Sequence, residues 1–172
     1  RAIRQQCPDL TLSVKMRSGF ELANEYQNWI SDWSCDKNDA PDFFILHSRS
    51  VREGYTPVTE DEHLQRSIDF INRDKQPVML NGDINNVQTA YDRMLKTNAS
   101  SFMSARGWLK NPYIFRNFEK GLFENSTDNE KFSFYLKVLE NAKILGYPYH
   151  KGKQIELSQL MFAPDNPFLA DL

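Results

Sequence analysis

The sequence predicts an α/β fold in which a parallel sheet is covered by helices. Apolar segments rich in β-forming residues alternate with amphipathic segments of helical period, and this alternation repeats four times. Successive strand segments begin about 25–34 residues apart, which is the length of a βα unit. The chain has 172 residues, so it is long enough to bury a core as one domain. Strand–helix alternation of this kind is typical of parallel sheets.

Each strand is predicted from its own pattern of side chains. Apolar and polar residues alternate strictly in the first segment, as in a strand with one buried face. The other segments are short apolar runs that end in polar residues or glycine. The predicted strands cover residues 10–16, 42–48, 76–80 and 101–105.

The helices are predicted where apolar residues recur at helical spacing. Residues 1–8 resemble the end of a helix that stops before Pro8, and Asn111–Pro112 begins a later helix because proline is tolerated best in a first turn. Past residue 120 or so the strands cease, and only helices are expected. The other predicted helices cover residues 21–33, 60–73, 86–96, 128–145 and 151–162.

Composition excludes several classes of protein. The formal charge of -2 argues against a general polyanion binder, so nucleic acid would have to meet a local basic patch. Cys7 and Cys35 lack CxxC neighbours, which argues against a disulfide framework or a zinc site. The three histidines lack metal-ligand spacing. No apolar run approaches the roughly 20 residues that span a bilayer, and no signal peptide is evident. We therefore expect no membrane partner and a cytoplasmic location, with a mitochondrial one left open.

Polar side chains follow the body of every predicted strand. Lys15, His47, Asn81 with Asp83, and Arg106 stand at the ends of the four strands in turn. Ligands bind at the carboxyl ends of strands in barrels and in open α/β sheets alike. Alternation places His47 and Arg49 on one face of the second strand, and it places Phe102, Ser104 and Arg106 on one face of the fourth.

A phosphate is the expected ligand at the last two strand ends. Gly82 and Gly107 follow these strands, and glycine lets backbone N–H groups approach an anion closely. Arg106 adds a fork-shaped donor. In many barrels the phosphate site follows strands seven and eight, so the four strands are predicted to be the second half of a (β/α)₈ barrel.

Each polar residue also has a purely structural explanation. Lys15 could extend past a strand end, His47 could be a hydrogen-bonded core histidine, Asn81–Asp83 could be only a turn, and Arg106–Gly107 could be the entry to a helix. Their occurrence at four consecutive strand ends favours a binding site.

Four ordered motifs resemble the tRNA-dihydrouridine synthase family, flavoproteins that reduce uracil to dihydrouracil in tRNA. The motifs are Val14-Lys15-Met16-Arg17-x-Gly19, His47-x-Arg49, Asn81-Gly-Asp83-Ile84 and Ala105-Arg106-Gly107-x-x-x-Asn111-Pro112. The resemblance covers roughly residues 8–120, and residues 135–161 are similar to the start of the family's C-terminal helical domain. It implies two domains, a partial FMN-binding barrel over 1–122 and the start of a helical domain over 123–172.

The resemblance implies FMN as cofactor, NADPH as reductant and tRNA as substrate. Lys15 and His47 would face the flavin, while the ribityl phosphate end would be held by Asn81, Gly82, Asp83, Ala105, Arg106 and Gly107. Many members have glycine where this chain has Ala105, and the backbone N–H survives that change. Tyr55 would lie beside the target uracil, and Arg49 near flavin or RNA.

One departure from the family pattern is large. The family's first four strands and its catalytic cysteine loop precede the lysine motif, and no segment of this chain matches that loop; Cys7 lies at the wrong place. We therefore assign no catalytic residue, expect the chain alone to be inactive, and interpret it as a fragment, a split-gene half or a degenerate relative. Its partner would be the missing barrel half or a larger assembly.

Two other functions remain open. A truncated, inactive barrel relative would act as a structural or RNA-contacting subunit of a larger assembly. Another FMN-dependent barrel oxidoreductase would instead act on a small molecule.

Overall fold

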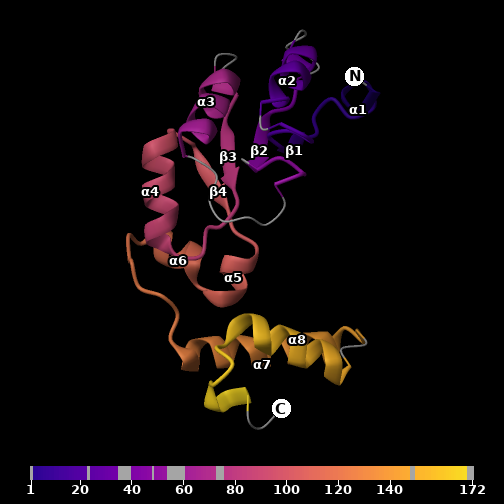
Figure 1. Ribbon diagram of the computed structural model, residues 1–172. Coiled ribbons are helices and arrows are strands. Elements are labelled where there is room, and N and C mark those ends of the chain that lie inside the picture. Colours follow the sequence, from indigo (N-terminus) through magenta and orange to yellow (C-terminus); the bar gives the residue numbers. More distant parts are fainter. Residues whose placement is uncertain are drawn as a thin grey trace. The chain divides into compact units, whose positions relative to one another are not determined.

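The computed structural model describes residues 2–22, 24–34, 40–47, 49–53, 61–72, 76–147 and 150–169 (Figure 1). The chain divides into two compact units. The first unit contains residues 1–82 and 90–103, and the second contains residues 83–89 and 104–172.

A parallel four-stranded sheet forms the centre of the first unit. Its strands pair in chain order, each with the next. They are β1 (Ser13–Arg17), β2 (Phe43–His47), β3 (Val78–Asn81) and β4 (Ser101–Met103). The predicted α/β class and its succession of βα units are confirmed, and the sheet is consistent with part of a TIM barrel.

The two faces of the sheet differ in burial. One face is apolar and closely packed, and its buried side chains are Met16, Phe44, Leu46, Val78, Leu80 and Phe102. The strand residues on the opposite face are all half-buried or exposed. They are Ser13, Lys15, Arg17, Phe43, Ile45, His47, Met79, Asn81, Ser101 and Met103. Because side chains alternate along a strand, the polar residues at the strand ends lie on this second face.

Helices fill the connections between strands and make up most of the second unit (Figure 1). They are α1 (Ala2–Gln6), α2 (Tyr26–Ser34), α3 (Asp61–Asn72), α4 (Val87–Thr97), α5 (Arg106–Lys110), α6 (Ile114–Glu119), α7 (Asp128–Ile144), α8 (Lys151–Met161) and the 3₁₀ helix η1 (Pro167–Leu169). In the first unit α2 packs on α3, and the rings of Tyr26 and Phe70 meet edge to face at 5.8 Å.

The helix predicted from Glu21 was wrong at its start, because α2 begins at Tyr26. The carboxylate of Glu25 accepts hydrogen bonds from the backbone N–H groups of Phe20 at 2.7 Å, Glu21 at 3.1 Å and Leu22 at 2.9 Å. These bonds lower the pKa of Glu25, with the Phe20 bond the largest cause. A carboxylate that gathers three donors folds residues 20–22 into a loop ahead of the helix.

The fourth strand also ends earlier than predicted. It stops at Met103, and a short helix, α5, begins at Arg106, whereas the next helix was predicted to begin at Asn111–Pro112. Pro112 does not open the next helix, since α6 begins at Ile114 after a turn.

The second unit has its own apolar core. Tyr135 from α7 packs with Leu157 and Met161 from α8, and Leu109 from α5 lies against this cluster. Trp108 of α5 meets the ring of Phe134 edge to face at 5.2 Å. The unit thus includes α5 and α6 as well as α7 and α8, whereas the division at residues 122 and 123 remains a prediction.

Candidate functional site

The strand register places three polar side chains in one row across the first unit. Arg17 pairs with His47, and His47 pairs with Asn81. Neighbours in register on parallel strands point to the same face, so all three share the open face at the carboxyl ends. Lys15 lies on this face two residues earlier, in register with Ile45, and is exposed. The structure therefore brings Lys15, His47 and Asn81 to one edge of one face.

His47 is held on two sides. Its Nδ1 accepts a hydrogen bond of 3.3 Å from the backbone N–H of Arg49. A Cβ atom added to Gly82 would lie 3.0 Å from Nε2 and 3.3 Å from Cδ2, so the imidazole ring rests against the backbone of Gly82. Since Nδ1 is an acceptor, the neutral ring carries its proton on Nε2.

The turn after β3 needs glycine at position 82. Gly82 has φ +110°, a conformation that L side chains rarely adopt, and Asp83 follows with φ +51°. In the first unit the guanidinium of Arg93, from α4, donates to the carbonyl of Gly82. Arg93 was not predicted, because its partner is eleven residues away and neither residue marks the other in the sequence.

Arg49 lies in a loop rather than on the second strand. β2 ends at His47, and Arg49 is buried, with 3% of its surface exposed. The loop that follows it is bonded to the loop after β1: Val51 N–H donates to the Gly19 carbonyl at 2.9 Å, and Arg17 donates to the Ser50 carbonyl at 2.8 Å. Arg49 is thus buried, whereas Lys15 is exposed. Tyr55 lies outside the described residues.

The expectation that Phe102, Ser104 and Arg106 share one face of the fourth strand was wrong. Phe102 pairs with Leu80 on the buried face, whereas Ser101 and Met103 lie on the open face. Ser104 and Arg106 follow the end of the strand, so strand alternation does not place them.

In the second unit, the residues after β3 and those after β4 meet. Arg106 Nη2 lies 3.5 Å from the Asp83 carboxylate, and both side chains are largely exposed. The Ser104 hydroxyl donates to the Ile84 carbonyl at 2.6 Å. Gly107 is buried, and a Cβ there would lie 1.8 Å from the Ile84 oxygen, so glycine is required for this approach.

Ala105 is the residue before α5. It is exposed, and its carbonyl accepts from the N–H of Leu109 at 3.3 Å. No side chain caps the first turn of α5. The contact between the residues after β3 and those after β4 thus brings together four predicted residues of the second unit, which are Asp83, Ala105, Arg106 and Gly107.

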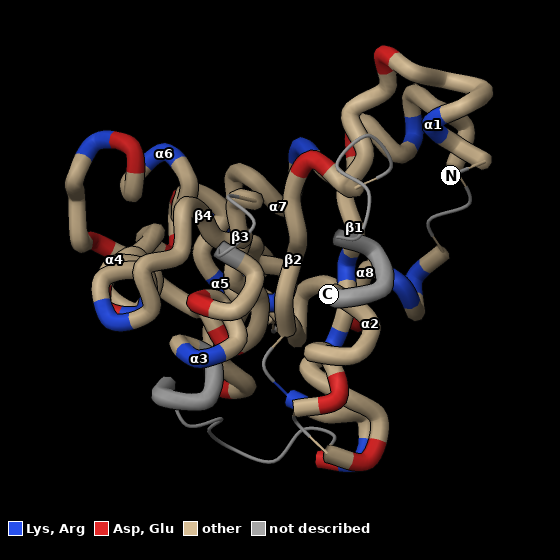
Figure 2. Tube along the Cα trace, turned by 90° about the horizontal axis from the view of Figure 1, so that it is seen from above, with Lys and Arg blue, Asp and Glu red and all other residues tan. Residues whose placement is uncertain are grey.

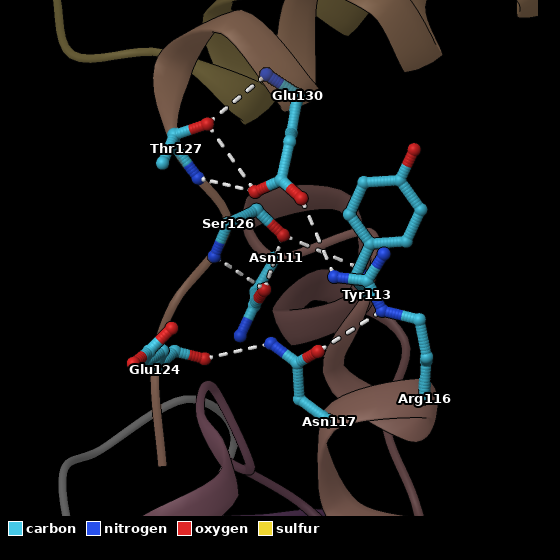
Figure 3. A network of polar contacts seen from close by, with 8 residues as sticks. All are labelled: Asn111, Tyr113, Arg116, Asn117, Glu124, Ser126, Thr127 and Glu130. Carbon is cyan, nitrogen blue, oxygen red and sulfur yellow. Dashed lines mark hydrogen bonds and ion pairs between the residues drawn. The ribbon is translucent and has the colours of Figure 1, made fainter. Parts of the chain in front are cut away.

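Asn111, in the last of the four motifs, is the centre of a polar network (Figure 3). It is buried, and its Oδ1 accepts from the backbone N–H of Ser126 at 2.9 Å and from the Ser126 hydroxyl at 2.5 Å. Asn117, also buried, donates to the Glu124 carbonyl at 2.9 Å. The network therefore ties residues 124–126 to the end of α5 and to α6.

The same network continues to the start of α7. Thr127 and Glu130 form a capping box, in which each side chain bonds the other residue's backbone N–H, and Arg116 pairs with Glu130 at 3.3 Å (Figure 3). The pKa of Glu130 is lowered, first by the Thr127 N–H and then by Arg116. Asn111 therefore has a structural role, which the short motif alone did not reveal.

Charge and metal-binding patterns in the described residues add little to the definition of the candidate site. Basic and acidic residues are interspersed along the described trace in Figure 2. No group of His, Cys, Asp and Glu side chains within the described ranges has the composition to hold a metal ion. Among the helices that the structure describes, none is both long enough and apolar enough to cross a membrane.

Comparisons with known proteins place the chain in a family. A family model described as dihydrouridine synthase matches residues 1–162. A "tRNA-dihydrouridine(47) synthase [NAD(P)(+)]-like" protein of Xenopus tropicalis is 28% identical over 128 residues, which are 72% of this chain and 19% of the relative. A "Probable tRNA-dihydrouridine synthase" of Helicobacter pylori is 31% identical over 67% of this chain and 33% of the relative. A "tRNA-dihydrouridine(20a/20b) synthase [NAD(P)+]-like" protein of Mus musculus is 29% identical over 68% of this chain and 34% of the relative.

The chain thus spans between about a fifth and a third of the length of these curated relatives. The family match, in contrast, extends over nearly all of the chain, and the four motifs lie within it. The chain belongs to the dihydrouridine synthase family.

Proposed function

We propose that this chain is part of a flavin-dependent tRNA-dihydrouridine synthase, which reduces uridine to dihydrouridine in tRNA with FMN and NADPH. The observation that carries the proposal is the alignment of Lys15, His47 and Asn81 on the open face of a parallel sheet in a member of this family. The names of the relatives support tRNA as substrate and a nicotinamide reductant.

The chemistry of these side chains fits FMN. A lysine ammonium, an imidazole and a carboxamide offer hydrogen-bond donors to the carbonyl and nitrogen atoms of a flavin ring. Arg106 offers a guanidinium fork, which suits phosphate oxygens. FMN, when bound and reduced by NADPH, would supply the hydride that reduces the pyrimidine.

We assign roles to individual residues as part of this proposal. Lys15 and His47 would bind the flavin, and Arg49 and Tyr55 would contact the substrate. The phosphate end would be bound by Asn81, Gly82, Asp83, Ala105, Arg106 and Gly107. The proton donor would come from a cysteine loop outside the 172 residues, so the chain alone would be inactive.

The proposal also covers the domain organisation of the protein. Residues 1–122 would complete a barrel with another segment of the protein, and residues 123–172 would begin a helical domain. A cytoplasmic location goes with this assignment.

The test uses the full-length protein that contains this chain. We expect it to bind FMN, visible as flavin absorbance, and to convert uridine to dihydrouridine in unmodified tRNA with NADPH. Lys15→Ala and His47→Ala should each weaken FMN binding. Lys137→Ala, which removes a lysine from α7, serves as the matched control and should leave FMN binding unchanged.

Other outcomes separate the alternatives. A colourless protein that cannot take up FMN would overturn the proposal, and if it still bound tRNA it would favour a structural or RNA-contacting subunit. Flavin binding without uridine reduction would favour an oxidoreductase that acts on a small molecule.

A further inference from the structure

We propose that Arg93 is a positioning residue, which holds the imidazole of His47 in place through the backbone of Gly82. The positioning is a property of the first unit alone. Its consequence for flavin binding rests on the proposed function.

The first step is the turn that Arg93 supports. Gly82 at φ +110° and Asp83 at φ +51° are consecutive residues with positive φ, which is ordinary for glycine but sparsely populated for aspartate. Such conformations persist when surrounding contacts hold them. Arg93 provides one such contact, because its guanidinium donates to the Gly82 carbonyl. A hydrogen bond from a charged donor is stronger than a neutral one.

The second step connects the turn to His47. The ring edge formed by Nε2, Cδ2 and Cε1 faces the side of Gly82 on which a side chain would project, at 3.0–3.4 Å from a Cβ placed there. The remaining ring nitrogen, Nδ1, accepts from the Arg49 N–H at 3.3 Å. The position of the imidazole is therefore set by two backbone groups, Gly82 and the Arg49 N–H. A shift of Gly82 would remove one of these two constraints on the ring.

The third step concerns the protonation of the ring. Acceptance at Nδ1 places the proton of the neutral imidazole on Nε2, the atom nearest to the added Cβ. If the turn relaxes, the ring can move away from the Arg49 N–H and both tautomers become accessible. Through the Gly82 turn, Arg93 thus influences which ring nitrogen of His47 carries the proton.

The experiment reads the ring nitrogens directly. The full-length protein is labelled with ¹⁵N-histidine, its ring resonances are recorded by NMR without FMN, and His47 is assigned with a His47→Gln variant. The wild type should show the Nε2–H tautomer. Arg93→Met should shift the His47 nitrogens toward a mixture of tautomers, and Arg93→Lys, which keeps a charged donor, should restore most of the wild-type pattern. Lys96→Met, on the exposed side of the same helix, should change neither nitrogen.

A second readout is FMN affinity. Loss of a charge-assisted hydrogen bond should weaken FMN binding by about tenfold in Arg93→Met, with partial rescue in Arg93→Lys. If Arg93→Met does not fold, Arg93→Gln, which keeps a polar side chain but loses the charge, carries the test, with a shift toward mixed tautomers as the expected result. Unchanged His47 nitrogens in a folded Arg93→Met or Arg93→Gln variant would overturn the proposal. If the wild type binds no FMN but its ring responds to Arg93→Met, the positioning stands and the proposed function fails.

Discussion

Asn111 accepts two hydrogen bonds from Ser126 through a single oxygen, one from the backbone N–H at 2.9 Å and one from the hydroxyl at 2.5 Å. The residues are fifteen positions apart, and both are buried. The Ser126 oxygen also accepts from the N–H of Tyr113 at 3.3 Å. The connection between α6 and α7 is thus fixed by a buried polar contact at the residue that ends α5.

Asn111→Ala should destabilise the protein by about 2–3 kcal/mol, because the buried N–H and hydroxyl of Ser126 would both lose their acceptor. The free energy of unfolding, measured by urea denaturation of the full-length protein, checks this.

Asn111→Asp is the matched variant for that prediction. It keeps an oxygen that can accept from Ser126 but loses the donor to Asn125, and its charge is costly to bury, so at a pH low enough to protonate the carboxyl it should cost less than the alanine variant. Equal losses in the two variants would contradict the assigned role of Oδ1.

Asp42 should make the free energy of unfolding depend on pH in the acidic range. Its pKa is lowered, first by the hydrogen bond from the Leu12 N–H at 2.6 Å and then by Arg4. A carboxyl whose folded pKa lies below its unfolded value of about 3.9 contributes stability above that pH, and the contribution is lost as pH falls through the folded pKa. The gap in unfolding free energy between wild type and Asp42→Asn should therefore narrow as pH falls from 7 toward 3, which denaturation at several pH values would measure.

Arg4→Met tests the cause of the Asp42 shift. Because the Leu12 N–H remains, this variant should retain part of the pH dependence that Asp42→Asn removes. Stability curves for Asp42→Asn and wild type that run parallel over this range would refute the prediction.

Gly107→Ala should destabilise the protein by about 1–3 kcal/mol, because the new methyl group would meet the Ile84 carbonyl and push α5 away from the loop that contains Ile84. Gly152→Ala is the control, since that glycine lies exposed in α8, meets only the His150 ring and should be neutral or gain helix stability. Thermal unfolding of both variants measures the difference. A stable Gly107→Ala would show that residues 84 and 107 do not need this close approach.

Thr127→Ala should weaken the start of α7 by about 1 kcal/mol, since it removes the side chain that accepts from the Glu130 N–H. Amide hydrogen exchange in the first turn of α7 should become faster. Glu130→Gln should have a smaller effect, because a carboxamide oxygen still accepts from the Thr127 N–H. Exchange that is unchanged in Thr127→Ala would rule out the capping box as a determinant of this helix end.

Much of the first unit could be predicted from local pattern. Strict alternation and short apolar runs indicated four strands, and parallel pairing then required that His47 and Asn81 share a face. The same reasoning failed for Phe102, because alternation gives the two faces of a strand but not which one turns to the helices. It failed at Glu21 because Glu25 bonds the backbone there in place of a helix turn.

The sequence by itself determined the α/β class, the succession of βα units and the motif residues Lys15, His47, Asn81 and Arg106, since these depend on local periodicity and on short patterns. The tertiary structure alone decided that Arg93 supports Gly82, that Asn111 holds Ser126 and that Arg49 is buried. These relationships join residues that are distant along the chain or depend on how whole elements pack. A polar side chain does not encode which distant carbonyl or N–H it will meet, because that partner is selected only when the surrounding backbone has been placed.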